Sequence, residues 1–124
     1  MPHRLLVVED EAGARSLIGV ALRQVGLHVY MAADGQAAVA LFRENHRDIA
    51  AVLLDFVLPD GDGLTVLAAL RAIDPHVRCV FVTAATDPET QARLQALGPV
   101  RVVPKPFMMS DLVEAVRAVL PAEG

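Results

Sequence analysis

Several polar residues of this sequence follow short apolar runs and could act together on a phosphate group or a divalent cation. They are Glu9, Asp10, Asp55, Thr83 and Lys105. Carboxylates held close together repel one another, and a divalent cation relieves that repulsion. Ligands that offer only oxygen atoms suit Mg²⁺ or Mn²⁺ rather than zinc. The three acids therefore predict a metal site with a hydroxyl and an ammonium group beside it.

Each of these residues, taken alone, also has an ordinary structural explanation. An acid after a strand is often the N-cap of the next helix, and Glu11 is expected to lie in a first helical turn. Thr83 alone fits a strand or cap position, and Lys105 alone fits an exposed loop. Asp55 is harder to explain in this way, because it ends the most apolar segment, where an unused charge is costly. The combination therefore supports a functional site.

Two patterns alternate along the chain and would position these residues. A continuous apolar run, typical of a strand buried on both faces, lies at 5–8, and further strands are expected at 29–32, 49–54, 80–82 and 100–103. A segment with apolar residues at helical spacing follows each run, the first over 12–25. Gly26 and Gly98 are expected to end helices, and Asp87 and Ser110 to cap them. Five such β-α units predict an α/β fold, a parallel sheet with helices on both faces.

The polar residues would meet at one edge of this sheet, because the crevice of an open α/β sheet lies at the carboxyl ends of its strands. A chain of 124 residues and 13.2 kDa is long enough for one domain with its own core. We expect a single domain over 1–124, with its core at about 4–120.

Composition excludes several classes of protein. A content of 54% hydrophobic and 21% charged residues is typical of a globular rather than a disordered chain. The net charge of −4 argues against nucleic-acid binding by this chain alone. No apolar run approaches the roughly 18 residues of a membrane span, and the N-terminus does not resemble a signal peptide. Cys79 is the only cysteine, which excludes an internal disulfide, so a cytoplasmic protein is expected.

Four motifs, in the right order and spacing, resemble the receiver (phosphoacceptor) domain of two-component response regulators. They are LLVVEDE, VLLDFVLPDGDGL, VFVTA and PKPF. The resemblance implies a flavodoxin-like (βα)5 sheet of order 2-1-3-4-5. It further implies a phosphorelay protein that accepts a phosphoryl group on Asp55 from a histidine kinase or a histidine phosphotransfer protein. Such a domain signals through altered binding to a downstream protein. It is not an enzyme in the usual sense, although it assists its own phosphorylation and dephosphorylation with Mg²⁺.

The same resemblance implies a role for each site residue. Asp55 would be the nucleophile. The implied metal ligands are Glu9, Asp10, Asp55 and the backbone carbonyl of Val57. The implied contacts to the phosphoryl oxygens come from Thr83, the backbone amide of Ala84 and Lys105. The Lys105–Pro106 bond would be cis, and the segment 107–109 is expected to belong to a docking surface for the phosphodonor.

Three positions depart from the common pattern of the family. Glu9 stands where Asp is frequent, Val57 where many relatives carry a polar residue, and Val102 where many carry Tyr or Phe. In those relatives the ring moves inward on activation. Val102 is short and β-branched, so a smaller change is expected along its strand.

Two alternatives from other classes stay open at this point. One is a pseudo-receiver that binds partners and is never phosphorylated, against which the complete set of Asp10, Asp55, Thr83 and Lys105 argues. The other is a small phosphatase of the haloacid-dehalogenase type, for which Asp60-x-Asp62 would supply the acids. No clear strand delivers Asp60 to the sheet edge, and Val57 stands where the second Asp of that class is needed.

Overall fold

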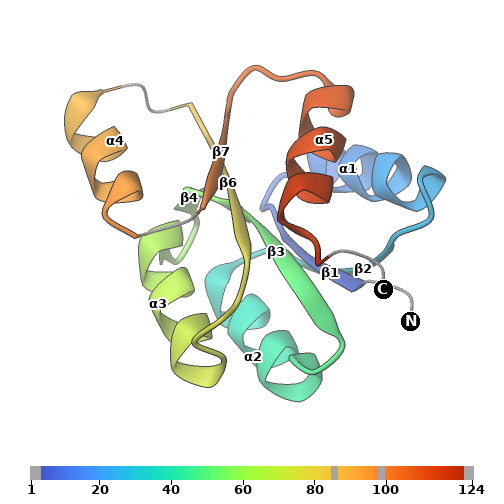
Figure 1. Ribbon diagram of the computed structural model, residues 1–124, viewed down its shortest axis with the longest axis horizontal. Helices are drawn as coiled ribbons and strands as arrows, with labels where there is room; N and C mark the ends of the chain where they lie inside the picture. The colour runs from blue at the N-terminus through green and yellow to red at the C-terminus, as the bar shows by residue number, and fades with distance from the viewer. Residues whose placement is uncertain (1–3, 85–86, 98–99, 122–124) are drawn as a thin grey trace.

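A parallel sheet of five strands forms the centre of the protein, in a computed structural model that describes residues 4–84, 87–97 and 100–121 (Figure 1). Its strands are β1 (Arg4–Val8), β2 (His28–Ala32), β3 (Ile49–Asp55), β6 (Cys79–Thr83) and β7 (Arg101–Pro104). They are hydrogen-bonded in the order β2-β1-β3-β6-β7. Counted along this sheet alone, that is the predicted order 2-1-3-4-5, so the α/β flavodoxin-like fold is confirmed.

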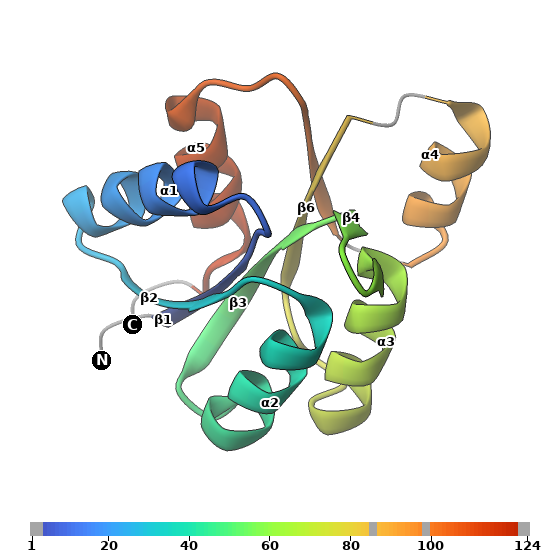
Figure 2. The same cartoon turned by 180° about the vertical axis from the view of Figure 1, so that it is seen from behind.

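Five helices cover the two faces of the sheet. They are α1 (Ala12–Gln24), α2 (Gly35–Asn45), α3 (Gly63–Ile73), α4 (Pro88–Gln95) and α5 (Met109–Val119). Figures 1 and 2 show α1 and α5 on one face, and α2, α3 and α4 on the other. No helix in the described ranges is long and apolar enough to cross a membrane.

Successive residues of the strands feed two separate apolar cores, as the period of two along a strand requires. Leu5 and Val7 of β1 pack with Leu22 of α1 and Leu112 of α5. Leu6 and Val8 pack instead with Phe42 of α2 and Leu67 and Leu70 of α3. Each buried leucine contributes about 1.5–3 kcal/mol to the free energy of unfolding. This burial on both faces explains why residues 5–8 of β1 form a continuous apolar run.

A small antiparallel hairpin after β3 was not predicted from the sequence. Its strands, β4 (Val57–Leu58) and β5 (Gly61–Asp62), pair with Val57 opposite Asp62 and Leu58 opposite Gly61. Gly61 has a φ of 151°, which favours glycine. Strands of two residues have no alternation to detect, so hydrophobic periodicity could not reveal them.

The helix ends agree only in part with prediction. Gly26 follows α1 with a φ of 87°, and Asp87 caps α4, both as expected. Glu11 is the N-cap of α1 rather than a first-turn residue, since its carboxylate accepts hydrogen bonds from the amides of Gly13 and Ala14. The expected stop at Gly98 lies outside the described residues.

The prediction that Ser110 caps the last helix was wrong. Helix α5 begins at Met109, so Ser110 already lies inside its first turn. The carboxylate of Asp111 reaches back and accepts a hydrogen bond of 3.3 Å from the backbone N–H of Met108. This acid satisfies an amide at the helix start, so the helix can begin before the serine.

Candidate functional site

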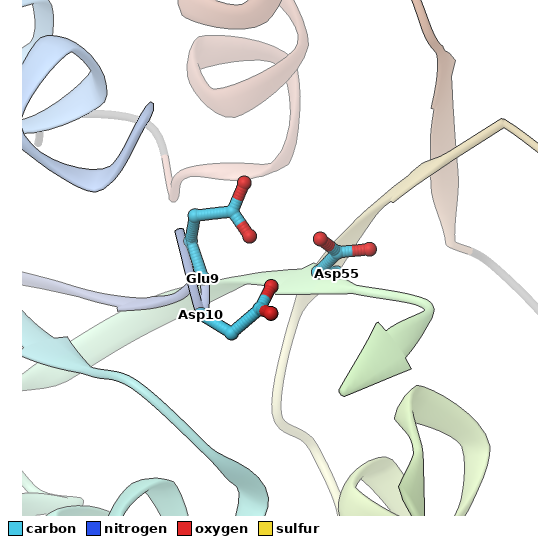
Figure 3. A group of neighbouring side chains, drawn as sticks. All are labelled: Glu9, Asp10 and Asp55. Atoms are coloured by element: carbon cyan, nitrogen blue, oxygen red, sulfur yellow. The ribbon is translucent and has the colours of Figure 1, made fainter. Parts of the chain in front are cut away.

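Three carboxylates meet at the carboxyl end of the sheet. Glu9 and Asp10 directly follow β1, and Asp55 is the last residue of the neighbouring β3. One carboxylate oxygen from each of the three lies within 4.8 Å of the others (Figure 3). Glu9 and Asp55 are each only 7% exposed, whereas Asp10 is exposed to solvent. The parallel topology therefore brings together the acids that the sequence predicted as metal ligands.

Lys105 provides the positive charge of the site. Its ammonium Nζ lies 3.0 Å from Oδ2 of Asp55 and donates a hydrogen bond to it. The backbone N–H of Lys105 donates to the carbonyl of Thr83 at 2.8 Å, which continues the pairing of β7 with β6 beyond the last paired residues. Burial lowers the pKa of Lys105, but the hydrogen bond and charge of Asp55 outweigh it, so the pKa is raised. Lys105 is thus a fixed cation.

Asp55 is held by the backbone on its other side. Its Oδ1 accepts a hydrogen bond of 3.2 Å from the N–H of Val57. The next residue, Phe56, donates its N–H to the carbonyl of Val82 at 3.0 Å and accepts one from Gly63 at 2.7 Å. A Cβ at Gly63 would lie 2.7 Å from the carbonyl oxygen of Asp55, so only glycine allows this approach. These contacts fix the direction of the nucleophile predicted from the sequence.

The pKa of Glu9 is strongly perturbed by its surroundings. Burial, followed by the hydrogen bond and charge of Asp55, raises its pKa to about 7, although Lys105 opposes the shift. Its Oε2 is buried and has no hydrogen-bond partner among the described residues. A buried carboxylate oxygen without a partner is costly, and a cation bound between the three acids would satisfy it. The donor set of oxygen atoms fits a hard divalent cation such as Mg²⁺.

The remaining predicted residues lie around this cluster. Thr83 is 2% exposed and ends β6, which pairs Val82 with Asp55. Ala84 follows it and is exposed. Val57 is 68% exposed, and its backbone pairs with Asp62 in the hairpin. Only the backbone of this residue was predicted to contribute to the site. The Lys105–Pro106 bond is cis, as the resemblance implied.

The segment 107–109 divides between core and surface. Phe107 and Met109 are partly buried against the core beneath α1 and α5. Met108 is 70% exposed. Only Met108 of the three is therefore freely available to a partner, and docking of a phosphodonor on this segment stays a prediction. Val102 is partly buried against the other core.

Sequence reasoning missed two residues that support the site. The guanidinium of Arg15 donates hydrogen bonds to the carbonyl of Glu9 at 2.8 Å and to that of Asp10 at 3.3 Å.

The carboxylate of Asp60 accepts from the amides of Gly35 and Gln36, both at 2.9 Å. Asp62 caps α3 through the N–H of Thr65. Asp60 and Asp62 are both engaged at helix N-termini, which argues against their use as a phosphatase pair.

Comparison with known proteins agrees with this geometry. A family model described as the response regulator receiver domain matches residues 5–117. The transcriptional regulatory protein TrcR of Mycobacterium tuberculosis is 34% identical over 119 residues, which cover 96% of this chain and 46% of that protein. Sporulation initiation phosphotransferase F of Bacillus subtilis is 29% identical over 124 residues, covering 100% of this chain and 98% of that protein. The chain thus spans about half the length of the mycobacterial regulator and nearly all of the phosphotransferase.

Solved structures show the same fold. The chemotaxis protein CheY4 of Vibrio cholerae superimposes with a TM-score of 0.87 at 24% identity, covering 97% of this chain and 100% of that one. The receiver domain of the hybrid histidine kinase CckA gives a TM-score of 0.81 at 30% identity, covering 95% and 99%. Together with the family model and the arrangement of Asp55, Lys105 and the two neighbouring acids, these similarities show that the chain belongs to the response regulator receiver domain family.

Proposed function

We propose that this domain accepts a phosphoryl group on Asp55, in a reaction that depends on Mg²⁺, and that it signals through altered binding to a protein partner. One observation carries the proposal. The buried carboxylate of Asp55 lies 3.0 Å from a fixed ammonium group and within 4.8 Å of two further carboxylates. Such a cluster is costly in a fold that does not use it, and it suits the transfer of a highly charged group.

The chemistry is a substitution at phosphorus. A carboxylate oxygen of Asp55 attacks the phosphorus of a phosphohistidine, and an acyl phosphate O–P bond forms. The P–N bond breaks, and its electron pair stays on the histidine nitrogen. A carboxylate is a weak nucleophile, so the rate depends on positioning and on neutralising the charge of the phosphoryl oxygens.

One cation and two hydrogen-bond donors of this chain supply part of that neutralisation. Lys105 would exchange its contact with Oδ2 of Asp55 for a phosphoryl oxygen. The Thr83 hydroxyl and the Ala84 amide would each donate a hydrogen bond to the same group. Glu9, Asp10, Asp55 and the Val57 carbonyl would hold Mg²⁺, which when bound compensates the charge shared by the acids and the phosphoryl oxygens.

The phosphodonor would be a histidine kinase or a histidine phosphotransfer protein. The relatives include a phosphotransferase and transcriptional regulators by name, and this supports a place in a phosphorelay. The phosphorylated domain would then act by binding a protein partner rather than by turning over a substrate. The domain promotes only its own phosphorylation and its own dephosphorylation. Because it does not convert a separate substrate, we do not class it as an enzyme.

Labelling with acetyl phosphate tests the proposal. Incubation with Mg²⁺ should add a single phosphoryl group, detected by intact mass spectrometry, and Asp55→Asn should abolish the addition. Asp48→Asn is the matched control, because Asp48 directly precedes β3, at the end opposite to Asp55, and is exposed. Comparable labelling of the Asp55→Asn protein would refute the assignment. A wild type that is neither labelled nor consumes acetyl phosphate would instead indicate a pure interaction module. Consumption of acetyl phosphate that persists in the Asp55→Asn protein would indicate a phosphatase that uses other residues.

A further inference from the structure

Asp60 links the hairpin after Asp55 to a helix of a different β-α unit. It lies in the turn between β4 and β5, and its two oxygens accept one hydrogen bond each from the first residues of α2. Oδ1 accepts the N–H of Gly35 and Oδ2 that of Gln36, both at 2.9 Å. These partners are separated from Asp60 by 25 and 24 residues. The contact is therefore tertiary, although it resembles a helix cap.

Helix α2 already has a cap residue of its own. Asp34 is its N-cap and accepts a hydrogen bond of 2.7 Å from the N–H of Ala37. The remaining free amides of the first turn, which point out of the helix and carry positive partial charge, are those that Asp60 binds. These hydrogen bonds lower the pKa of Asp60, so the carboxylate stays ionised and the contact persists at neutral pH.

The chain is shaped to allow this contact. A Cβ at Gly35 would lie 2.7 Å from Cγ2 of Val66 and 3.2 Å from Oδ1 of Asp60. Any side chain at this position would press on helix α3 and on the carboxylate together. Glycine at the first residue of α2 therefore permits close approach of the hairpin as well as of the neighbouring helix.

The hairpin needs an external support. Two residues in each strand cannot form a stable hairpin alone. Its first residue, Val57, donates its N–H to Oδ1 of Asp55, so the orientation of the hairpin and that of the nucleophile are connected. The far end of the hairpin is held by Asp60. Leu58 packs in the core at the near end of the hairpin, and the Asp60 contact at the start of α2 adds a second constraint. The direction of the Val57 backbone, and of the carbonyl proposed to bind Mg²⁺, is therefore coupled to that contact.

We infer that Asp60 is a positioning residue for the phosphorylation site, which it supports by anchoring the β4–β5 hairpin to the N-terminus of α2. The inference rests on the proposed function. It adds that α2, which contributes no side chain to the acidic cluster in the described structure, takes part in holding the metal site in its binding geometry.

The test compares two variants that remove a carboxylate from the same helix end. Asp60→Ala removes the anchor, and Asp34→Ala removes only the local cap. Calorimetric titration with Mg²⁺ should show a dissociation constant raised about 10-fold for Asp60→Ala, as for residues that orient metal ligands. Asp34→Ala should stay within about twofold of wild type, although it destabilises the helix. Asp60→Asn keeps one acceptor oxygen and should lie between wild type and Asp60→Ala.

The outcomes separate this inference from the proposed function. Equal changes in Mg²⁺ affinity for Asp60→Ala and Asp34→Ala would mean that only helix capping matters, and would overturn it. Unchanged affinity in Asp60→Ala would overturn it as well. If Asp60→Ala does not fold, as judged by circular dichroism, Asp60→Asn decides, and wild-type affinity in that folded variant would count against the anchor. Failure of the wild type to react with acetyl phosphate would refute phosphorylation, whereas Mg²⁺ affinity would still report on Asp60.

Discussion

The two ends of the central sheet hold their charged side chains in different ways. At the carboxyl end, Glu9 and Asp55 are buried beside one another, and Lys105, which follows β7, forms an ion pair with Asp55. At the amino end, Arg78 and Arg101 stand exposed before β6 and within the start of β7. Further arginines lie in the last turns of the helices that end there, namely Arg23, Arg43, Arg71 and Arg117.

General electrostatics explains the amino end but only part of the carboxyl end. Cations near helix C-termini complement the negative end of the helix dipole, and in solvent they cost little. Acids at helix N-termini follow the same rule, as the capping residues Asp34, Asp62 and Asp87 illustrate. Glu9 and Asp55 cap no described helix and are nevertheless buried. Buried acids that cap no helix therefore mark the functional end of the sheet.

The largest effect is expected from removing the cation at the carboxyl end of β7. Lys105→Ala should slow labelling by acetyl phosphate by about 10–100-fold, because a charge-assisted hydrogen bond contributes about 1.5–3 kcal/mol. Arg101→Ala, at the other end of the same strand, is the matched control and should leave the rate unchanged. Rates can be followed by intact mass against time. Similar losses in both variants would remove the distinction between the two ends.

Metal binding should stabilise the fold through the carboxyl end alone. In denaturant titrations, Mg²⁺ at a hundredfold excess over its dissociation constant should raise the free energy of unfolding by about 2.7 kcal/mol relative to chelator. Asp10→Asn should shrink this gain, since one anionic ligand is lost, and should be more stable than wild type in chelator because repulsion is relieved. Asp48→Asn should keep the full gain. A wild type without any metal-dependent gain would contradict the site.

Glu9 should make the metal-free protein more stable as the pH falls. Its pKa is raised to about 7 from an ordinary 4.5, so the native state holds this proton more tightly than the unfolded chain does. The free energy of unfolding in chelator should therefore fall as the pH rises from 4.5 through about 7. Glu9→Gln cannot ionise and should flatten this part of the profile. An identical pH profile for the two proteins, measured by chemical denaturation, would show that the pKa of Glu9 is not raised.

Much of the fold and the whole acidic cluster could be predicted, because both follow from short-range patterns combined with one topological rule. Apolar runs located the strands, and parallel connection placed Glu9, Asp10 and Asp55 at one edge. The role of Asp60 could not be predicted, because its partners are the backbone amides of Gly35 and Gln36. Every residue other than proline has such an amide, so the residue types give no signal of this contact. The start of α5 was predicted wrongly because serine is a common N-cap residue and Ser110 fits that pattern. The residue that binds the free amide at the helix start is instead Asp111, which lies inside the helix.

The division of the apolar interior into two cores bears on how far the sequence of such a domain can diverge. The residues that pack beneath α1 and α5 and those beneath α2 and α3 are separated by the backbone of the sheet, which both layers share. Substitutions in separate clusters without shared partners tend to combine additively. Each layer can then drift and repack on its own, while the hydrogen-bonded strands between them preserve the common architecture. Relatives with 30% identity can therefore retain the same fold, as the CckA receiver domain does.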